Sequence, residues 1–355
     1  MTNLDRIRAA LREESLEGII IARPEDRFWA SGFGGSAGTL LVTLDDAVLM
    51  TDFRYTEQAA AEAPAFRVVE GRPDGDVLAR LILESGASKI GFDPNYATVH
   101  WYERLRPQIE GKTLVPVEQL LAGLRSRKTP AEVDIMARAA QIADRAFLAA
   151  LERIRPGVKE RDIALEIEFF MRREGAEHLA FDMIVTSGKR SSMPHGCATD
   201  KLIEEGDFVT IDYGAVVSGY CSDATRTVVA GRASEEQRRI YDLVSRAQMA
   251  ALEAIGPGKD CAAMDAVARG VIEEAGHGEH FGHTLGHGVG VAVHEMPSLG
   301  EQSVGILLVP GNVVSVEPGV YIPGWGGVRI EDVVAITREG YRSLTCVPKQ
   351  LIEIG

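Results

Sequence analysis

Two aspartates lie close together in the segment GDFVTIDYGAVVSGYCSDATRTVVAG, residues 206–231. Runs in which apolar and polar residues alternate flank a short Val-Val-Ser-Gly connection, which predicts a β-hairpin. If Val217 and Ser218 form the centre of the turn, Asp212 and Asp223 face each other directly. Opposed like charges destabilise a sheet, so a cation or a shared proton should compensate them. The alternative is a hairpin one residue out of register, with both charges solvated.

A second acidic pair lies in VVSVEPGVYIPGWGGVRIEDVVAIT, residues 313–337. Glu317 ends an apolar run, and Glu331 is predicted to lie in a strand that begins at a Gly-Gly pair. Arg329 should share the face of Glu331, because side chains two apart in a strand point the same way. Arg329 could simply pair with one of these acids. A carboxylate among Val and Ile is costly unless it is paired or metal-bound, and one arginine cannot neutralise four.

Six of the eight histidines fall between residues 195 and 294, most densely in HTLGHGVGVAVHE. The spacing of four between His283 and His287 could suggest a helical zinc motif, but the surrounding glycines disfavour a helix. We therefore expect a strand in which these two histidines share a face. A lone histidine in such a segment is typically a hydrogen-bonded core residue. Four candidate carboxylate ligands elsewhere in the chain favour a metal ligand instead.

Four carboxylates and one imidazole would balance the charge of two divalent cations. Oxygen ligands with a single nitrogen suit Mn²⁺, Co²⁺ or Zn²⁺ better than a metal that prefers thiolates. Two metals about 3.5–4 Å apart generate a bridging hydroxide nucleophile and polarise a carbonyl group. The residues therefore predict a dinuclear metallohydrolase.

The positioning elements fall into two predicted domains, residues 1–123 and 124–355. The first alternates short β runs (18–22, 39–43, 47–51, 89–93 and 113–117) with helical patterns (76–86 and 97–111), which predicts an α/β domain with a mixed sheet. It contains no Gly-x-Gly-x-x-Gly or Walker pattern, so nucleotide binding has no support. The second begins with a capping box and a proline at Thr129-Pro130-Ala131-Glu132, which predicts a helix from there to about Ile154.

The second domain contains an internal repeat. Residues 150–157 read ALERIRPG, and residues 251–258 read ALEAIGPG. A helical run precedes each copy, and a second helical run and a strand-rich segment follow it. This predicts a duplicated unit that brings two β-hairpins together with a cleft between them.

Charge and composition limit the possible partners. The net charge of −14 disfavours nucleic acid and anionic membranes. No stretch is long enough to span a membrane, and the charged amphipathic N-terminus does not resemble a signal peptide. The four cysteines are scattered, which suits a reducing compartment. We expect a cytoplasmic protein without nucleic-acid or membrane partners.

Three motifs together resemble the proline-specific "pita-bread" metallopeptidases, aminopeptidase P and prolidase. They are HTLGHGVGVAVHE, IDYGAVVSGYCSDATRT and VEPGVYIPGWGGVRIED. The resemblance covers nearly the whole chain. It implies an α/β creatinase-like N-terminal domain and an α+β pita-bread catalytic domain with a pseudo-two-fold internal repeat. It also implies a dinuclear site, usually manganese, with the ligands Asp212, Asp223, His287, Glu317 and Glu331.

The same resemblance implies roles for neighbouring side chains. His195 would hydrogen-bond near the scissile bond or the substrate proline, and His294 would stabilise the tetrahedral intermediate. Glu317 would also carry a proton to the leaving nitrogen. Three residues would line the substrate pocket: His283, Tyr321 and Arg329. A salt bridge for Arg329 and a packing contact for Tyr321 are the alternatives.

The N-terminal domain resembles that of aminopeptidase P, through SGFGGSAGTLLV and LMTDFRYTEQA. The predicted function is therefore an Xaa-Pro aminopeptidase whose substrate is a peptide with proline at position two. The chain length, however, is close to that of small prolidases, which cleave only Xaa-Pro dipeptides. Arg54 could reach the active site of a neighbouring subunit or form a salt bridge within its own sheet. The resemblance also implies a homodimer.

Three further alternatives rank lower. Methionine aminopeptidase shares the catalytic fold, but the large N-terminal domain and the GGVRIED segment resemble the proline-specific branch. Metal-free creatinase-like enzymes and non-catalytic binding proteins typically lack several ligand carboxylates. This chain has a carboxylate at every such position.

Overall fold

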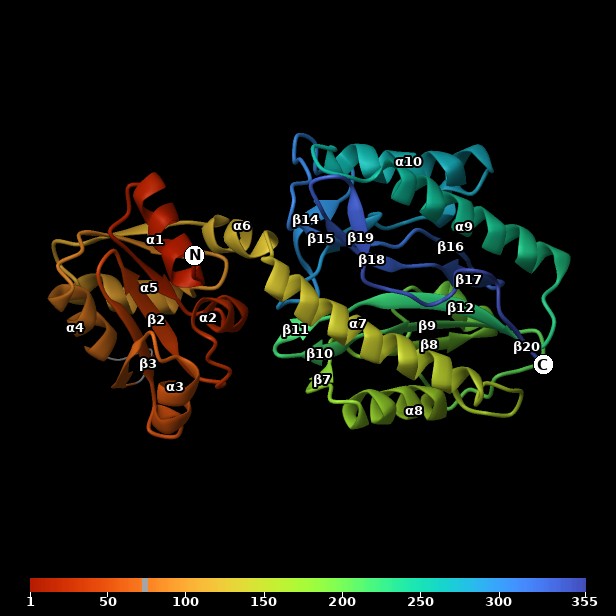
Figure 1. The fold of residues 1–355 in the computed structure, drawn as a ribbon, viewed down its shortest axis with the longest axis horizontal. Coiled ribbons are helices and arrows are strands. Elements are labelled where there is room, and N and C mark those ends of the chain that lie inside the picture. Colours follow the sequence, from red (N-terminus) through yellow and green to blue (C-terminus); the bar gives the residue numbers. More distant parts are fainter. Residues whose placement is uncertain (72–75) are drawn as a thin grey trace. The chain divides into compact units, whose positions relative to one another are not determined.

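The computed structural model describes residues 1–71 and 76–355 (Figure 1). The chain divides into two compact units, Met1–Arg125 and Ser126–Gly355. Within the described residues, no helix combines the length and the apolar character that crossing a membrane would require.

The N-terminal unit is built on one six-stranded mixed sheet with the order β4-β3-β2-β1-β5-β6. All five predicted strands are present. A sixth strand, β4, was not predicted; it is short, only partly buried and located at the edge of the sheet. The strands are β1 (Gly18–Ile21), β2 (Thr39–Thr43), β3 (Ala47–Thr51), β4 (Arg67–Glu70), β5 (Lys89–Phe92) and β6 (Thr113–Pro116).

Helices complete this unit because the central strands β1, β2 and β3 are buried along their whole length and need cover on both faces. Ile20, Leu41 and Val48 pack in one cluster with Leu78 and Ile82 of the fourth helix. The segment 97–111, predicted as one helix, forms α5 followed by the short 3₁₀ helix η1. The helices are α1 (Asn3–Glu13), α2 (Pro24–Ser31), α3 (Thr56–Glu62), α4 (Asp76–Glu84), α5 (Val99–Leu105), η1 (Arg106–Gln108) and α6 (Leu120–Ser126).

The C-terminal unit repeats the order helix, helix, strands, as the internal repeat predicts. The predicted capping box is present, since the Thr129 side chain accepts from the backbone of Glu132 and the Glu132 side chain accepts from the backbone of Thr129. The first half comprises α7 (Pro130–Leu151), α8 (Glu160–Arg173), β7 (His178–Leu179), β8 (Ile184–Ser187), η2 (Gly188–Ser192), β9 (Phe208–Tyr213), β10 (Ala215–Val217), β11 (Tyr220–Cys221) and β12 (Ala224–Ala230).

The second half begins with another helix pair and ends near the C-terminus. It comprises α9 (Glu235–Ala254), α10 (Cys261–Glu274), η3 (Gly278–His280), β13 (Gly286–Gly288), β14 (Glu295–Leu299), β15 (Val313–Val316), β16 (Gly319–Ile322), β17 (Gly326–Arg329), β18 (Asp332–Ile336), β19 (Tyr341–Ser343) and β20 (Glu353–Ile354). The last strand, β20, pairs with β12 of the first half.

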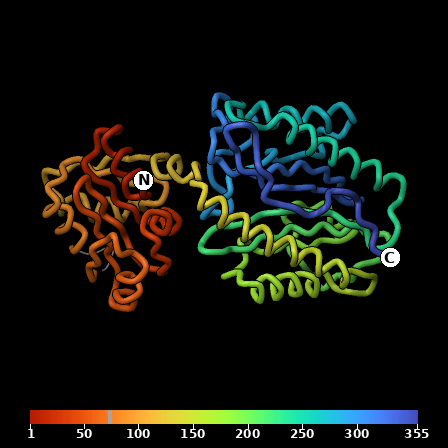
Figure 2. The backbone as a smooth tube through the Cα atoms, in the orientation of Figure 1, coloured from red at the N-terminus to blue at the C-terminus, as the bar shows by residue number. Residues whose placement is uncertain are grey.

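Each helix pair covers the strands of its own half. One core cluster joins α7 and α8 to β8, β9 and β12, and another joins α9 and α10 to β15 and β18. Helices α8 and α10 lie on opposite sides of the strands (Figure 1). The green strands of the first half and the blue strands of the second half run side by side (Figure 2). The fold therefore places two β-hairpins back to back in the middle of the unit.

The first hairpin, β9 to β12, differs in register from the prediction. Val217 pairs with Tyr220, so Ser218 and Gly219 form the turn. Both have positive φ, 47° and 74°, the combination that a tight two-residue hairpin turn requires. Asp212 therefore pairs with Thr225, not with Asp223. The predicted register was wrong by two residues. Because side chains alternate with a period of two, this shift keeps Asp223 on the same face as Asp212 and makes the two acids diagonal neighbours.

The second hairpin, β15 to β18, interrupts its ladder at the acidic residues. Val316 pairs with Asp332 and Gly319 pairs with Arg329, so one register continues across the break and sets Glu317 opposite Glu331. The prediction that Glu331 lies in a strand was wrong. It lies between β17 and β18, where its backbone N–H donates to the carbonyl of Thr225 in the first hairpin.

Candidate metal centre

The five predicted ligands meet between the two hairpins. The ligand atoms of Asp223, His287 and Glu331 all lie within 4.8 Å of one another. His287 Nε2 lies 3.1 Å from Glu317 Oε1 and 3.7 Å from Asp223 Oδ2. Asp212 contributes to the electrostatics of this group and influences the pKa of both Asp223 and Glu331. The two hairpins are more than 70 positions apart in the sequence, and their acids together form one carboxylate cluster.

Arg329 compensates only part of this negative charge. Its guanidinium donates to Asp212 Oδ2 at 2.6 Å, which is the ion pair that the sequence left open as an alternative. Four carboxylates and one guanidinium leave three uncompensated charges unless protons or cations bind. Two buried oxygens, Asp212 Oδ1 and Glu331 Oε1, have no hydrogen-bond partner in the described part of the chain. Such oxygens are costly without a partner, and a bound cation would supply one.

The pKa shifts follow this crowding. Burial raises the pKa of Asp223 and Glu331 well above the usual range, and neighbouring carboxylates raise it further. Burial also raises the pKa of Asp212, although Arg329 opposes the shift. Burial would raise the pKa of Glu317 as well, but the hydrogen bond and charge of His287 outweigh it and lower the pKa to about 2. The cluster favours any positive charge placed inside it.

His287 is held by a close approach of three strands. A Cβ at Gly286 would lie 2.1 Å from the carbonyl oxygen of Ser315, and one at Gly288 would lie 2.3 Å from that of Met296. Only glycine fits on either side of His287, which explains the glycine-rich sequence around it. His287 Nδ1 lies 3.1 Å from the carbonyl of Gly288 and can donate to it, so Nε2 faces the carboxylates. That nitrogen is the one available to a cation.

His283, Tyr321 and Arg329 form a hydrogen-bonded chain beside the cluster. His283 Nδ1 lies 2.8 Å from the carbonyl of Thr284 and can donate to it. Its Nε2 then accepts from the Tyr321 hydroxyl at 3.0 Å, and that hydroxyl accepts from Arg329 at 3.0 Å. The prediction that His283 shares a strand face with His287 was wrong, because β13 begins only at Gly286.

His294 and His195 are exposed at the edge of the cluster. The ring centroids of His294 and His287 are 4.1 Å apart. His195 directly follows Pro194, whose carbonyl accepts from Arg329 at 3.2 Å. Both histidines can therefore present a ring nitrogen to a bound molecule without serving as buried structural groups.

Sequence reasoning missed two hydroxyls that bind the carboxylates. Thr225 Oγ1 donates to Glu331 Oε2 at 2.7 Å, and Ser315 Oγ donates to Glu317 Oε1 at 2.9 Å. Each lies two residues from an acid of its own hairpin, Asp223 or Glu317, so the period of two in a strand could have indicated that they share a face.

A buried aspartate, also missed, anchors the histidine loop. Asp265 pairs with Arg269 and accepts from the backbone N–H of Leu285. Arg269 in turn donates to the carbonyls of Phe281 and His283. This network fixes the loop that leads into β13.

Arg54 lies in the N-terminal unit, and its guanidinium donates two hydrogen bonds of 2.8 Å to Asp52. This is the local salt bridge, one of the two roles that the sequence left open. The side chain is 59% exposed. A contact with a neighbouring subunit stays a prediction.

Comparisons with known families agree with this geometry. A family model described as metallopeptidase family M24 matches residues 134–338. The chain belongs to this family. A second model, described as the creatinase/prolidase N-terminal domain, matches residues 3–127. The predicted fold, a creatinase-like domain followed by a pita-bread catalytic domain, is confirmed.

Similar proteins cover the chain from end to end. It is 43% identical to the Xaa-Pro dipeptidase of Bacillus anthracis, with a TM-score of 0.94 and 99% of each chain covered. It is 35% identical to the X-Pro aminopeptidase of Thermotoga maritima, with a TM-score of 0.94 and 100% of each chain covered. It is 38% identical to the Xaa-Pro dipeptidase of Pyrococcus furiosus, covering 98% of this chain and 99% of that protein.

Membership of the M24 family implies divalent metal ions, and the cluster fits them. Its donors are carboxylate oxygens and one imidazole nitrogen, the set that suits Mn²⁺, Co²⁺ or Zn²⁺. The two orphaned oxygens lie on different hairpins, Asp212 on the first and Glu331 on the second. A bound cation would supply the partner that each of these oxygens lacks in the described part of the chain.

Proposed function

We propose that this M24 metallopeptidase hydrolyses the bond between an N-terminal residue and a following proline. The single observation that carries the proposal is the buried cluster of Asp223, His287 and Glu331, with Glu317 in contact with His287 and Asp212 close enough to act on the pKa of Asp223. The names of similar proteins, which are Xaa-Pro dipeptidases and an X-Pro aminopeptidase, support the substrate class.

We propose Asp212, Asp223, His287, Glu317 and Glu331 as the ligands of two divalent ions, with Mn²⁺ as the first candidate. When bound, such ions would supply a Lewis acid for the scissile carbonyl and lower the pKa of a coordinated water. Glu317 accepts a hydrogen bond from Ser315, which orients its carboxylate to receive a proton and pass it on.

The exposed histidines would contact the substrate. His294, next to His287, can donate to the scissile carbonyl oxygen and stabilise charge that develops there. His195 can donate to a carbonyl of the same peptide. The hydrogen-bonded Arg329–Tyr321–His283 chain gives the pocket a rigid wall, against which a prolyl ring could pack.

Substrate length separates two versions of this function. The N-terminal motifs favour an aminopeptidase that accepts longer peptides. The names of similar proteins support the dipeptidase at least as well, since two of the three cited are Xaa-Pro dipeptidases. We expect metal-dependent turnover of both Ala-Pro and Ala-Pro-Gly-Gly if the aminopeptidase version is correct.

The deciding measurement is kcat/KM for Ala-Pro and Ala-Pro-Gly-Gly with added Mn²⁺. Ala-Ala and Ala-Ala-Gly-Gly serve as matched controls for the requirement for proline. Turnover of the dipeptide alone would identify a prolidase. Equal turnover of the alanine controls would contradict proline specificity in either version.

A further inference from the structure

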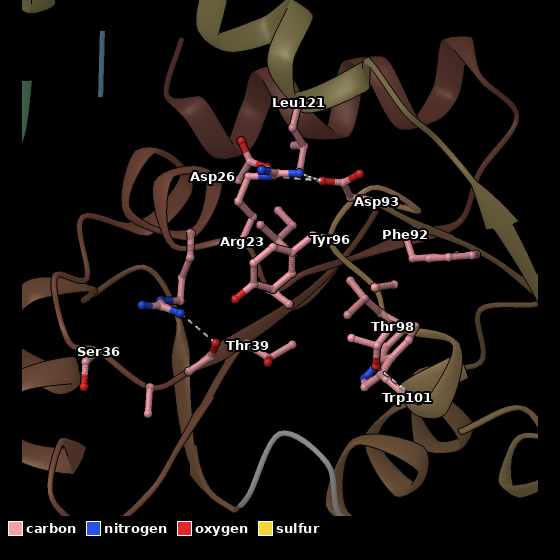
Figure 3. Close-up of a pocket in the computed structure, with 17 residues that line it drawn as sticks. Arg23, Asp26, Ser36, Thr39, Phe92, Asp93, Tyr96, Thr98, Trp101 and Leu121 are labelled. Atoms are coloured by element: carbon pink, nitrogen blue, oxygen red, sulfur yellow. Dashed lines mark hydrogen bonds and ion pairs between the residues drawn. The ribbon is translucent and has the colours of Figure 1, made fainter. Parts of the chain in front are cut away.

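The N-terminal unit contains a cavity of about 360 Å³, within the range of small-molecule sites (Figure 3). Three segments that are separate in sequence line it: the end of β1 with the first turn of α2, the start of β2, and the region from the end of β5 into α5. Leu121 of α6 closes it further. The residues belong to a single unit, so the cavity is a property of this domain.

The walls are largely apolar, with several hydroxyl groups and a few charged side chains. Phe92 and Trp101 lie on one side in Figure 3, and Ser36 lies on the opposite side. Thr39 and Tyr96 also line the cavity. Aromatic walls with a few polar groups suit the apolar body of a small organic molecule.

Most charged groups in and around the cavity are already paired. Arg23 donates two hydrogen bonds to Asp93, at 2.8 and 2.9 Å. Asp26 lies 2.8 Å from Arg125. These pairs leave no net charge.

Arg27 is different. Its side chain lines the cavity, the residue is only 4% exposed, and among the described residues it forms no ion pair with a carboxylate. Its two terminal nitrogens donate to the backbone carbonyls of Gly35 and Gly38. Its Nε has no hydrogen-bond partner among the residues that the structure describes. Burial lowers the pKa of Arg27, which reflects the cost of keeping this charge away from water.

The other buried arginines show what Arg27 lacks. Arg125, Arg226 and Arg329 each contact a carboxylate, at 2.8, 2.7 and 2.6 Å. A buried cation is normally paired, because burying a charge without a partner is strongly unfavourable. Arg27 is a buried guanidinium at a cavity wall with a free N–H and no counter-ion among the described residues.

We propose that this cavity binds a small organic carboxylate, which pairs with Arg27 while its apolar body packs against Phe92 and Trp101. A carboxylate supplies both the negative charge and the acceptor oxygens that a guanidinium requires. An inorganic anion would leave the apolar walls uncovered, and a neutral ligand would leave the charge of Arg27 uncompensated. The site is separate from the carboxylate cluster and does not depend on the proposed peptidase function.

Calorimetric titration of the full chain with benzoate tests this proposal. Benzoate should bind once per chain, and at least tenfold more tightly than its neutral isostere benzamide or inorganic sulfate. Arg27→Gln should weaken benzoate at least tenfold. Arg80→Gln removes an exposed arginine from the same unit and should leave the affinity unchanged. Circular dichroism confirms that each variant is folded.

A second variant keeps the test decisive if Arg27→Gln does not fold. Ala97→Trp places a bulky ring at the partly exposed wall without removing a charge, and it should abolish benzoate binding by filling the cavity. Equal affinity for benzoate and benzamide, or unchanged binding to Ala97→Trp, would overturn the proposal. So would failure of benzoate, phenylacetate and hexanoate all to bind.

Discussion

The two hairpins of the C-terminal unit bring their acids together in different ways. In the first hairpin, Asp212 pairs with Thr225, so its neighbour Asp223 is diagonal to it. In the second hairpin, one continuous register sets Glu317 opposite Glu331. The direct confrontation of carboxylates predicted for the first hairpin thus occurs in the second.

One acid of each hairpin has its partner on the other hairpin. Arg329 of the second hairpin pairs with Asp212 of the first, and Thr225 of the first donates to Glu331 of the second. Among the described residues, Asp212 therefore has a fixed cation, whereas the side chain of Glu331 accepts only from a hydroxyl. The difference indicates that a bound metal stabilises Glu331 more than Asp212.

The largest expected effect comes from removing an acid that both hairpins surround. Asp223→Ala should abolish Xaa-Pro hydrolysis and lower the metal content of purified protein, because it removes a ligand atom close to both His287 and Glu331. Asp200→Ala, which removes an exposed aspartate from the same unit, is the control. Wild-type turnover in Asp223→Ala would reject the site.

A substitution outside both hairpins should separate substrate chemistry from metal binding. His294→Ala should lower kcat by roughly 10²–10³-fold, the usual cost of losing one oxyanion donor, and leave metal content unchanged. His178→Ala is the matched control, since it removes another exposed histidine. A loss of metal with His294→Ala would mean that this side chain belongs with the ligands.

The link between the hairpins can be weakened without removing a ligand. Thr225→Val should reduce metal affinity about 10–100-fold, since the hydroxyl orients Glu331. Thr227→Val is a matched control in the same strand, because Thr227 donates to the backbone carbonyl of Arg329 and not to a carboxylate. Equal metal affinity in the two variants would show that the Thr225–Glu331 bond does not matter.

The smallest effects concern the free energy of unfolding after a chelator has removed the metal. Substituting one acid in each hairpin should change this free energy in opposite directions. Glu331→Gln should stabilise by about 1–3 kcal/mol because it removes a buried charge that has no cation. Asp212→Asn should destabilise by a similar amount because Arg329 loses its partner. Urea denaturation after metal removal measures the stability of both variants. If both substitutions stabilised the protein, or both destabilised it, the proposed difference between Asp212 and Glu331 would be wrong.

The same chelated protein offers a test by pH. The raised pKa of Glu331 means that the folded state takes up a proton more readily than the unfolded state. Without metal, the wild-type protein should have a lower free energy of unfolding than Glu331→Gln at pH 7. This difference should shrink as the pH falls from 7 toward 5. A difference that grows over this range would show that the pKa is not raised.

Local patterns in the sequence predicted most of the elements. The five strands of the N-terminal sheet and the capping box at Thr129 could be identified because apolar alternation and capping residues act over a few positions. The sequence missed β4, whose four residues carry little pattern. The hairpin register failed because Ser218 adopts a left-handed conformation that non-glycine residues rarely show.

The sequence by itself determined which residue types gather in the C-terminal half: four carboxylates in β-rich segments, a glycine-flanked histidine and a repeated helix pair. Only the tertiary structure decided which acids face one another and which partner each receives. Arg329 could have paired with any of them, and the back-to-back packing of two hairpins more than 70 residues apart in sequence placed it next to Asp212. Arg27 shows the same limit, because its lack of a counter-ion among the described residues depends on how separate segments fold around it.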